Sequence, residues 1–307
     1  MKEILVIGGS YFLGRVCVEE LLKKKEFTVT VVNRGKLPLN KDRVREIVCD
    51  RHDTEGMKNL LAGTKWDAVI DFCAYAPGDI GEVFQTGIPK ETTQYIYIST
   101  ASVYAKTNMF PVKEEAPKLE GPQPELGPFA DYAFNKLLLE EELTAQCGEL
   151  GTAWTIIRPA FIYGKYNYAP RENYFFDLIV RNEKVIIPER SLTLFSFVSV
   201  WDTARIIIGC AGNEAVFGKP FNVSAEELVS YPMLMDVLRE VTSISFNVET
   251  KSIETIIHEN IPLPFPLDEH LVYDGTLIAD TLQFRYTSFL EGMRETYRLY
   301  RIGRGLS

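Results

Sequence analysis

Short apolar runs alternate with segments of helical spacing along the first half of the chain. Six such runs are rich in β-branched and aromatic residues and are predicted to be strands: residues 4–7, 28–32, 44–48, 68–70, 95–98 and 154–157. The run 4–7 is continuously apolar, so both of its faces are expected to be buried. Residues 12–25 and 131–149 carry the strongest helical patterns. The alternation predicts a parallel, doubly wound α/β sheet with right-handed crossovers.

The alternation weakens after about residue 165. Helical patterns continue with short strands between them, near residues 171–182, 200–211, 230–242 and 287–300. The pattern therefore predicts a first domain over 1–165 and a smaller C-terminal lobe over 166–307, some of whose segments are expected to return to the first domain. Residues 106–130 are rich in Pro, Glu and Gly and are predicted to form a long loop, which in a compact domain is usually functional or mobile.

Composition narrows the classes of function. The 307 residues carry a net charge of −9, which disfavours nucleic acid binding because such binding depends on Lys and Arg contacts to phosphates. The basic run Lys23–Lys25 is interpreted as a solvated helix end. Five scattered cysteines, an odd number without a CxxC pair, favour a reducing compartment, and three isolated histidines disfavour a metal site. No run approaches the length of a membrane helix, so a cytoplasmic protein is expected.

A glycine-rich turn lies between the first predicted strand and the first predicted helix. It reads Gly8-Gly9-Ser10-Tyr11-Phe12-Leu13-Gly14. Glycines at such a turn allow close helix–strand packing, and the helix N-terminus attracts a pyrophosphate. The strand before it and the helix after it make a dinucleotide site the favoured interpretation over a plain turn. We therefore expect Gly8, Ser10, Tyr11, Phe12, Leu13 and Gly14 to bind a cofactor.

The end of the second predicted strand bears on the choice of cofactor. Asn33 stands where an acidic residue would bind the ribose of NAD, and Arg34 follows it. An Arg can bind a 2′-phosphate, whereas a carboxylate would repel it. The segment thus favours NADP over NAD, unless Arg34 is only a surface charge. Asp50 and Arg51 follow the third predicted strand, where a side chain could meet the adenine.

Several motifs together resemble a known family. They are the glycine turn, Asp50-Arg51, and the stretches 97–104, 132–136, 158–164, 197–202, 221–224 and 289–293. In this order the chain resembles the NAD-dependent epimerase/dehydratase family of the extended short-chain dehydrogenase/reductase superfamily, over nearly its whole length. The resemblance implies a Rossmann-type doubly wound parallel sheet with a smaller C-terminal substrate lobe. It also implies NAD(P)-dependent chemistry on a hydroxyl or carbonyl of a nucleotide-sugar or similar small molecule, and a possible homodimer.

The candidate catalytic residues include a Tyr and a Lys on one helix face. Tyr132 and Lys136 are four residues apart, so we expect the ammonium to lower the phenol pKa from about 10. Tyr132 could then exchange a proton with the substrate oxygen while hydride passes to or from the cofactor. The resemblance implies a hydroxyl after the fifth strand as the third member. Thr100 is the best match, with Ser99 and Ser102 as alternatives, since such hydroxyls often only cap the backbone.

The resemblance adds further cofactor-binding candidates after the fourth, fifth and sixth strands: Phe72, Cys73, Ala74, Ser99, Pro159, Phe161 and Ile162. Cys73 could be a reactive thiol or plain packing. The chain also departs from the family pattern. Tyr11 occupies the place of a glycine and either points away from the phosphates or covers them. Ala101 and Ser102 stand where dehydratases carry acids, which favours epimerase or reductase chemistry.

The sequence leaves alternatives open. A non-catalytic NADP-binding regulator or an RNA-associated atypical relative competes with the enzyme, as does, more weakly, a structural partner with dormant chemistry. The intact Tyr132–Lys136 pair argues against a pure sensor, and the acidic balance argues against RNA. The substrate cannot be read from the second lobe. Arg171, Arg190 and Arg205 could pair with phosphates, but ion pairs with the protein are the simpler interpretation.

Overall fold

A seven-stranded parallel sheet organises the first domain. In the computed structural model, which describes residues 1–306, its strand order is β10-β6-β5-β4-β1-β2-β3. The strands are β1 (Lys2–Ile7), β2 (Phe27–Asn33), β3 (Val44–Val48), β4 (Trp66–Asp71), β5 (Thr92–Ile98), β6 (Ala153–Pro159) and β10 (Lys219–Val223). The order reverses between β1 and β4, which both pair in parallel register. Ligands of such sheets bind at this reversal, beyond the carboxyl ends of the strands. The predicted fold class is confirmed.

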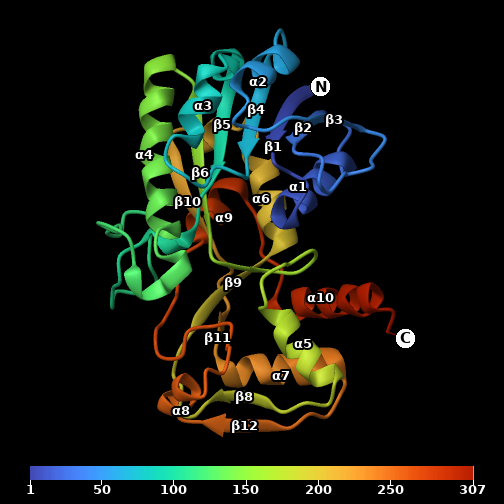
Figure 1. Ribbon diagram of the computed structural model, residues 1–307, viewed down its shortest axis with the longest axis vertical. Coiled ribbons are helices and arrows are strands. Elements are labelled where there is room, and N and C mark those ends of the chain that lie inside the picture. Colours follow the sequence, from blue (N-terminus) through green and yellow to red (C-terminus); the bar gives the residue numbers. More distant parts are fainter. Residues whose placement is uncertain (307) are drawn as a thin grey trace.

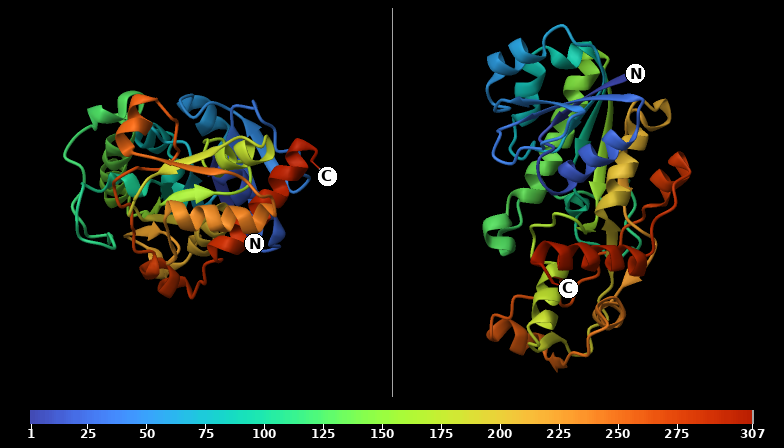
Figure 2. Two further views of the ribbon diagram at one scale, coloured as in Figure 1. Left: turned by 90° about the horizontal axis from the view of Figure 1, so that it is seen from below. Right: turned by 90° about the vertical axis from the view of Figure 1, so that its right-hand side faces the viewer.

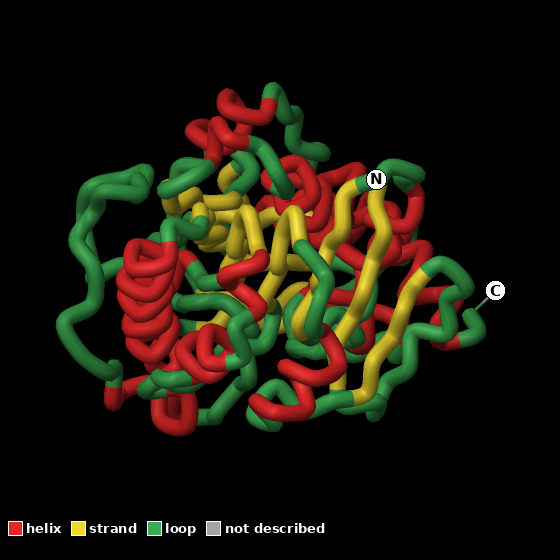
Figure 3. The backbone as a smooth tube through the Cα atoms, turned by 90° about the horizontal axis from the view of Figure 1, so that it is seen from above, coloured by secondary structure: helices red, strands yellow, loops and turns green. Residues whose placement is uncertain are grey.

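Helices cover both faces of this sheet, which gives three layers (Figures 1 and 3). One face carries α1 (Phe12–Lys23), α6 (Val200–Cys210) and α9 (Thr276–Leu282), and the other carries α2 (Thr54–Leu61), α3 (Asp79–Gln85) and α4 (Tyr132–Leu150). Val6 points to the first face and Leu5 to the second, and both are fully buried. The unbroken apolar run of β1 is therefore explained by burial on both sides.

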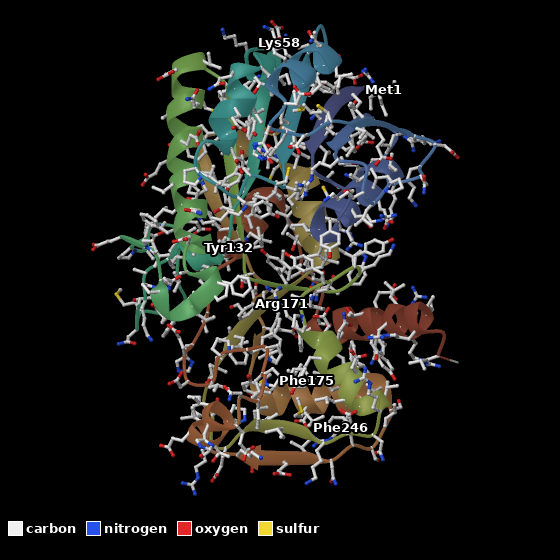
Figure 4. All side chains as sticks on the ribbon, viewed as in Figure 1. Met1, Lys58, Tyr132, Arg171, Phe175 and Phe246 are labelled. Carbon is white, nitrogen blue, oxygen red and sulfur yellow. The ribbon has the colours of Figure 1, made fainter. Side chains whose placement is uncertain are left out.

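The second lobe forms around an aromatic core below the sheet (Figures 1, 2 and 4). Its strands are β7 (Phe161–Tyr163), β9 (Phe195–Ser199) and β11 (Leu228–Val229) in one sheet, and β8 (Val185–Pro188) and β12 (Val248–Lys251) in another. Its helices are α5 (Glu172–Val180), α7 (Tyr231–Thr242), α8 (Ile253–His258) and α10 (Phe289–Arg304). The rings of Phe175, Phe195, Phe197 and Phe265 pack in its centre in stacked, tilted and edge-to-face pairs.

Three segments beyond residue 165 lie in the first domain. α6 and α9 cover the sheet, and β10 extends it by pairing with β6 from Lys219↔Thr155 to Val223↔Pro159. Residues 106–130 remain largely irregular, with one short 3-10 helix at Pro124–Phe129. Three further 3-10 helices are Ile88–Glu91, Ala101–Val103 and Glu214–Val216. Among residues 1–306, no helix is both long enough and apolar enough to cross a membrane.

A buried ion pair fastens α4 to the sheet. Glu140 of α4 accepts hydrogen bonds from Arg158 of β6 at 2.9 Å (Nε) and 2.5 Å (Nη2), and from the Ser99 hydroxyl at 2.5 Å. Each of the three side chains is almost inaccessible to water. Because both charges are desolvated, removal of one leaves the other without compensation. This pair lies one helical turn beyond Lys136 and so sets the position of the candidate catalytic helix.

We predict that Glu140→Ala lowers the free energy of unfolding by about 3–5 kcal/mol, because the Arg158 charge then stays buried and unpaired. Urea unfolding followed by far-ultraviolet circular dichroism measures this loss. Glu141→Ala is the matched control, since Glu141 is exposed on the same helix, and its effect should stay within about 0.5 kcal/mol. Equal losses for both variants would contradict the role assigned to the pair.

Candidate functional site

A cavity of about 880 Å³ opens at the carboxyl end of the sheet, where the strand order reverses. Its walls come from the glycine turn, from the ends of β2, β4, β5 and β6, from the start of α4, and from the segment before α5. This volume is in the range of small-molecule and cofactor sites. Most of the candidate residues line it: Gly8, Ser10, Tyr11, Phe12, Leu13, Gly14, Asn33, Arg34, Asp50, Arg51, Phe72, Cys73, Ser99, Thr100, Tyr132, Lys136, Pro159 and Ile162.

The glycine turn brings the N-terminus of α1 against the end of β1. Gly8 and Gly9 have φ of +100° and +73°, which side chains rarely tolerate. A Cβ on Gly14 would lie 2.9 Å from Gly9 Cα, so only glycine allows this approach. No side chain caps the first turn of α1. Its free N–H groups and helix dipole therefore make this end of the cavity suitable for an anion such as a pyrophosphate.

Two unpaired cations lie at the end of β2. Arg34 and Lys36 line the cavity, and neither forms an ion pair within residues 1–306. Both ends of the Asn33 side-chain amide are hydrogen-bonded to the protein in this loop. Its Nδ2 donates to Glu46 at 2.7 Å and its Oδ1 accepts from Gly35 N–H at 2.7 Å. The Glu46 carboxylate is thereby held by protein donors, which leaves Arg34 and Lys36 available to an added phosphate.

Arg51 does not reach freely toward a ligand. Its Nη1 donates to both oxygens of Asp71, at 2.9 and 3.1 Å, and its Nη2 donates to the Asp79 carbonyl at 2.5 Å. Asp71 is completely buried and also accepts from the Tyr95 hydroxyl at 2.7 Å. Burial alone would raise the pKa of Asp71, but Arg51 and these donors hold it below its usual value. Arg51 thus fastens α3 to β4, a role that the adjacent Asp50-Arg51 motif does not reveal.

Three other candidates also have structural roles in this structure. The Cys73 thiol has its pKa raised to about 12 by burial and by Asp71, so it stays protonated and packs against the glycine turn. Ala74 lies behind the cavity wall, where its carbonyl accepts from Lys136. Phe161 packs against Phe195, Phe197 and Phe265 in the core of the second lobe and does not line the cavity.

The three candidate catalytic residues share one wall of the cavity. Tyr132 begins α4, and its phenol and the Thr100 hydroxyl lie near each other on the cavity wall. Thr100 lies at the end of β5, and its Oγ1 also accepts from Ser102 N–H at 3.2 Å. Of the two alternatives, Ser99 donates its hydroxyl to Glu140, and Ser102 is exposed away from the cavity. The geometry therefore favours Thr100 as the hydroxyl beside Tyr132.

Lys136 bridges two strands beneath the cavity. Its Nζ donates to the Ala74 carbonyl at 2.8 Å and to the Ile98 carbonyl at 2.9 Å, and it lies 4.5 Å from the centre of the Tyr75 ring. Burial lowers the pKa of Lys136 to about 8, although Asp71 opposes the shift. Because an ammonium has three N–H groups, one donor remains for a ligand.

The expected acidification of Tyr132 is not present in this structure. Burial, followed by the nearby Tyr168 phenol, raises the pKa of Tyr132 above 10, and the opposing effects of Thr100 and Arg171 do not overcome it. The ammonium of Lys136 is directed at main-chain carbonyls, and desolvation dominates at the phenol. In this structure Tyr132 is therefore a protonated acid and not an activated base.

Sequence reasoning did not identify Tyr75 and Tyr168 on the cavity wall and favoured an ion pair for Arg171. Arg171 donates to the Ile162 carbonyl at 2.7 Å and packs over the Phe161 ring. It has no carboxylate within 4.0 Å in the described part of the chain, and burial lowers its pKa. Figure 4 shows Arg171 near Tyr132, between the two lobes. The one sequence signal that pointed to this part of the cavity was Arg171 itself, which follows the stretch 158–164.

One group of side chains could hold a cation. His52, Asp79 and Glu82 bring their ligand atoms within 4.8 Å of one another at the rim of the cavity. However, Asp79 Oδ2 already accepts from the Tyr75 and Ala76 N–H groups, at 2.7 and 3.0 Å, and His52 is hydrogen-bonded to Glu82. We therefore assign these residues to the attachment of α3 and of the turn that precedes it.

Comparison with known proteins identifies the relatives of this architecture. The model of the NAD dependent epimerase/dehydratase family matches residues 82–224, which include Thr100, Tyr132 and Lys136. The resemblance to this family is thus confirmed. The structure is similar to UDP-glucose 4-epimerase of Thermotoga maritima with UDP-glucose, with a TM-score of 0.78, 19% identity, and 98% and 99% of the two chains covered. That likeness bears on the fold.

Two relatives in sequence differ in their described roles. The chloroplast stem-loop binding protein of 41 kDa b of Arabidopsis thaliana is 29% identical over 244 residues, 75% of this chain. The chain spans 60% of that relative's length. UDP-N-acetyl-alpha-D-glucosaminuronate decarboxylase of Bacillus cytotoxicus is 24% identical and matches over 98% of both proteins.

The free cations at the end of β2 lead to a cofactor prediction. Arg34→Ala should lower the affinity for NADPH by about tenfold or more and the affinity for NADH by less. The reason is that a hydrogen bond to a charged group contributes about 1.5–3 kcal/mol. Calorimetric titration of each cofactor measures the difference. Arg43→Ala is the control, because Arg43 binds main-chain carbonyls away from the cavity. Equal losses for NADPH and NADH would refute a 2′-phosphate contact.

The buried Lys136 leads to a pH prediction. Its pKa is about 8 in the fold and about 10.4 when unfolded, so between these values the unfolded chain binds more protons. Between pH 8 and 10.4 the free energy of unfolding should therefore rise by on the order of 1–3 kcal/mol relative to Lys136→Met. Urea titrations across this range test the slope and not the absolute stability. Parallel curves for the two proteins would disprove the shift.

Proposed function

We propose that the chain is an NAD(P)-dependent oxidoreductase or epimerase that acts on a hydroxyl or carbonyl of a nucleotide-sugar or similar small molecule. The observation that carries the proposal is the grouping of Thr100, Tyr132 and Lys136 on one wall of a cavity that also contains the glycine turn. A dinucleotide site and an acid–base pair in one cavity are what hydride transfer to or from a carbon–oxygen bond needs.

The residues present fit a nicotinamide dinucleotide. The uncapped N-terminus of α1 would hold the pyrophosphate, and Arg34 and Lys36 would hold a 2′-phosphate, which favours NADP. The remaining Lys136 donor would bind a ribose hydroxyl, and Pro159 and Ile162 would flank the nicotinamide. When bound, the nicotinamide ring of the dinucleotide supplies the hydride acceptor or donor.

Tyr132 is the proton carrier of the proposed reaction. Its raised pKa keeps it protonated, so it is ready to protonate a carbonyl oxygen during reduction. Thr100 lies beside the phenol on the cavity wall and would orient the substrate oxygen. In the reverse direction Tyr132 must lose its proton, and the positive charge of Lys136 favours the anion that forms. Ala101 and Ser102 follow Thr100 without an acid, which makes dehydration the less favoured reaction.

Arg171 supports an anionic substrate. Its guanidinium lines the cavity without a carboxylate partner in the described residues, and burial lowers its pKa, so an arriving anion would offset the cost of desolvation. A nucleotide-sugar offers such an anion in its phosphates. The Thermotoga relative carries UDP-glucose, which is consistent with this class of substrate.

A second candidate function is suggested by the Arabidopsis relative, whose name describes stem-loop binding. If the protein had an RNA-associated role or were a non-catalytic NADP-binding regulator, the cavity would bind a cofactor that regulates this other activity. The net charge of −9 disfavours RNA, and the complete Thr100–Tyr132–Lys136 group favours catalysis. A cytoplasmic location and a homodimer also remain predictions from the sequence.

We predict that Tyr132→Phe lowers kcat/KM for cofactor-dependent conversion of nucleotide-sugars by at least about 100-fold, because the proton donor is lost. The Kd for NADPH should change by less than about twofold, since binding does not need this proton. A panel that includes UDP-glucose and UDP-glucuronic acid, followed by NADPH absorbance and product chromatography, measures turnover. Tyr174→Phe, which lies in the second lobe, is the control and should retain activity.

Undiminished turnover by Tyr132→Phe would refute the proposed mechanism. A stem-loop RNA titration at physiological ionic strength distinguishes the second candidate. Salt-sensitive RNA binding without turnover of the panel would place the RNA-associated role first.

A further inference from the structure

A short segment between β7 and α5 lies along α1 at the cavity. Residues 164–171, which we call the strap, run beneath α1 as the yellow-green loop of Figure 1. Arg15 and Glu19 are four residues apart on α1 and so share one face of the helix, and Tyr11 is the residue that precedes α1. The strap meets this face in the opposite direction, so that three successive contacts join the two segments.

The first contact is aromatic and lies at the cavity. Tyr168 of the strap stacks on Tyr11, with ring centres 5.0 Å apart and ring planes inclined by 25°. Phe12 meets the edge of the same ring at 5.8 Å. Tyr11, Phe12 and Tyr168 all line the cavity beside the glycine turn. The side chain that replaces the expected glycine therefore forms a roof at the pyrophosphate end of the cavity.

The other two contacts form a latch outside the cavity. The Arg15 guanidinium lies 5.2 Å from the centre of the Tyr166 ring, and the Tyr166 hydroxyl donates to Glu19 at 2.9 Å. Lys165 donates to the other Glu19 oxygen at 2.7 Å. Burial would raise the pKa of Glu19, but these donors lower it, so the carboxylate is charged and holds the strap.

The strap is held together by hydrogen bonds of its own and to the start of α5. The buried Glu172 carboxylate accepts from Gly164 N–H at 2.9 Å and from Asn167 Nδ2 at 2.9 Å, and Asn167 Oδ1 accepts from Ala169 N–H at 3.0 Å. These bonds do not involve α1 and would survive separation from it. Gly164, with φ of +123°, stands at one end, where glycine tolerates a change of main-chain angles.

The contacts with α1 favour a reversible closure. Tyr11 and Tyr168 are 54% and 63% exposed, so their stacking buries little surface. Arg15 Nε is buried without a hydrogen-bond partner, and its guanidinium lies against the Tyr166 ring of the strap, so opening would give this donor access to water. Weak surface contacts, combined with a buried unpaired donor, are suited to a segment that opens and closes.

We propose that the strap lifts from α1 to admit the dinucleotide and then closes over it, with Glu19 as the latch and the Tyr11–Tyr168 pair as the roof. This inference rests on the proposed binding of a nicotinamide dinucleotide. Opening then limits both entry and exit, so a weaker latch accelerates both rates. A simple contact with the ligand would instead change the exit rate alone.

Stopped-flow measurement of NADPH binding and displacement tests the strap. Glu19→Gln, which lies outside the cavity walls, should raise the association and dissociation rates together by about three- to tenfold, with Kd nearly unchanged. Tyr168→Phe should behave like the wild type and Tyr168→Ala like Glu19→Gln, because only the ring is needed. Lys41→Met is the matched control: Lys41 lies 3.9 Å from Glu19 but is not part of the strap.

Two results would overturn the strap: unchanged rates in Glu19→Gln, or a faster dissociation rate with an unchanged association rate. Failure of the wild type to bind NADPH or NADH would instead count against the proposed function. Trypsin cleavage after Lys165 tests the latch without a cofactor. Cleavage should be faster in Glu19→Gln than in the wild type or Lys41→Met, and equal cleavage of all three would also overturn the proposal.

Discussion

Lys136 fills the gap between the ends of β4 and β5, and the rest of the site depends on its buried ammonium. Its two bonds to the Ala74 and Ile98 carbonyls fix the first turn of α4 against the sheet. One turn later the Glu140–Arg158 pair repeats the attachment. Tyr132 begins the same helix, and its phenol lies near Thr100 on the cavity wall. A cation that was expected to tune the tyrosine thus first determines where the tyrosine is.

The cavity concentrates unpaired positive charge in an acidic protein. Three carboxylates near it are held by protein donors, while Asp50 on the cavity wall is exposed and accepts from the His52 N–H. The three are Asp71, held by Arg51, Asp79, held by main-chain N–H groups, and Glu46, held by Asn33. In contrast, Arg34, Lys36 and Arg171 face the cavity without carboxylate partners in the described residues. The net charge of −9 describes the whole surface and does not describe this cleft. A few unpaired cations on the wall of a cavity can make a local anion site without a basic composition.

Local patterns predicted the elements that local physics determines. The apolar run of β1, the glycine turn and the spacing of Tyr132 and Lys136 each required only neighbouring residues, and each lies where the sequence placed it. The choice among Ser99, Thr100 and Ser102 needed the fold, because Ser99 is taken by Glu140, which is distant in sequence. The direction of the pKa shift of Tyr132 also required the fold, since the effect of burial outweighs that of the nearby Arg171 charge.

Contacts between distant segments were beyond such reasoning. No spacing rule links Tyr11 to Tyr168 or shows that Phe161 packs in the second lobe. Likewise, Arg51 follows β3 in a position that suits a ligand contact, and only the structure shows that Asp71 of β4 captures it. These residues depend on which strands and loops become neighbours, and that is a property of the whole topology.

The Arg51–Asp71 contact has a consequence for how this protein can diverge. Loss of either partner alone leaves a buried charge unpaired and lowers the free energy of unfolding by about 3–5 kcal/mol. Replacement of both partners by neutral residues changes it little. Single substitutions at either position should therefore be purged by selection, and the two positions are expected to change together. A substitution at the end of β4 is then expected together with one after β3. A lineage that has acquired this ion pair should retain both residues unless both change.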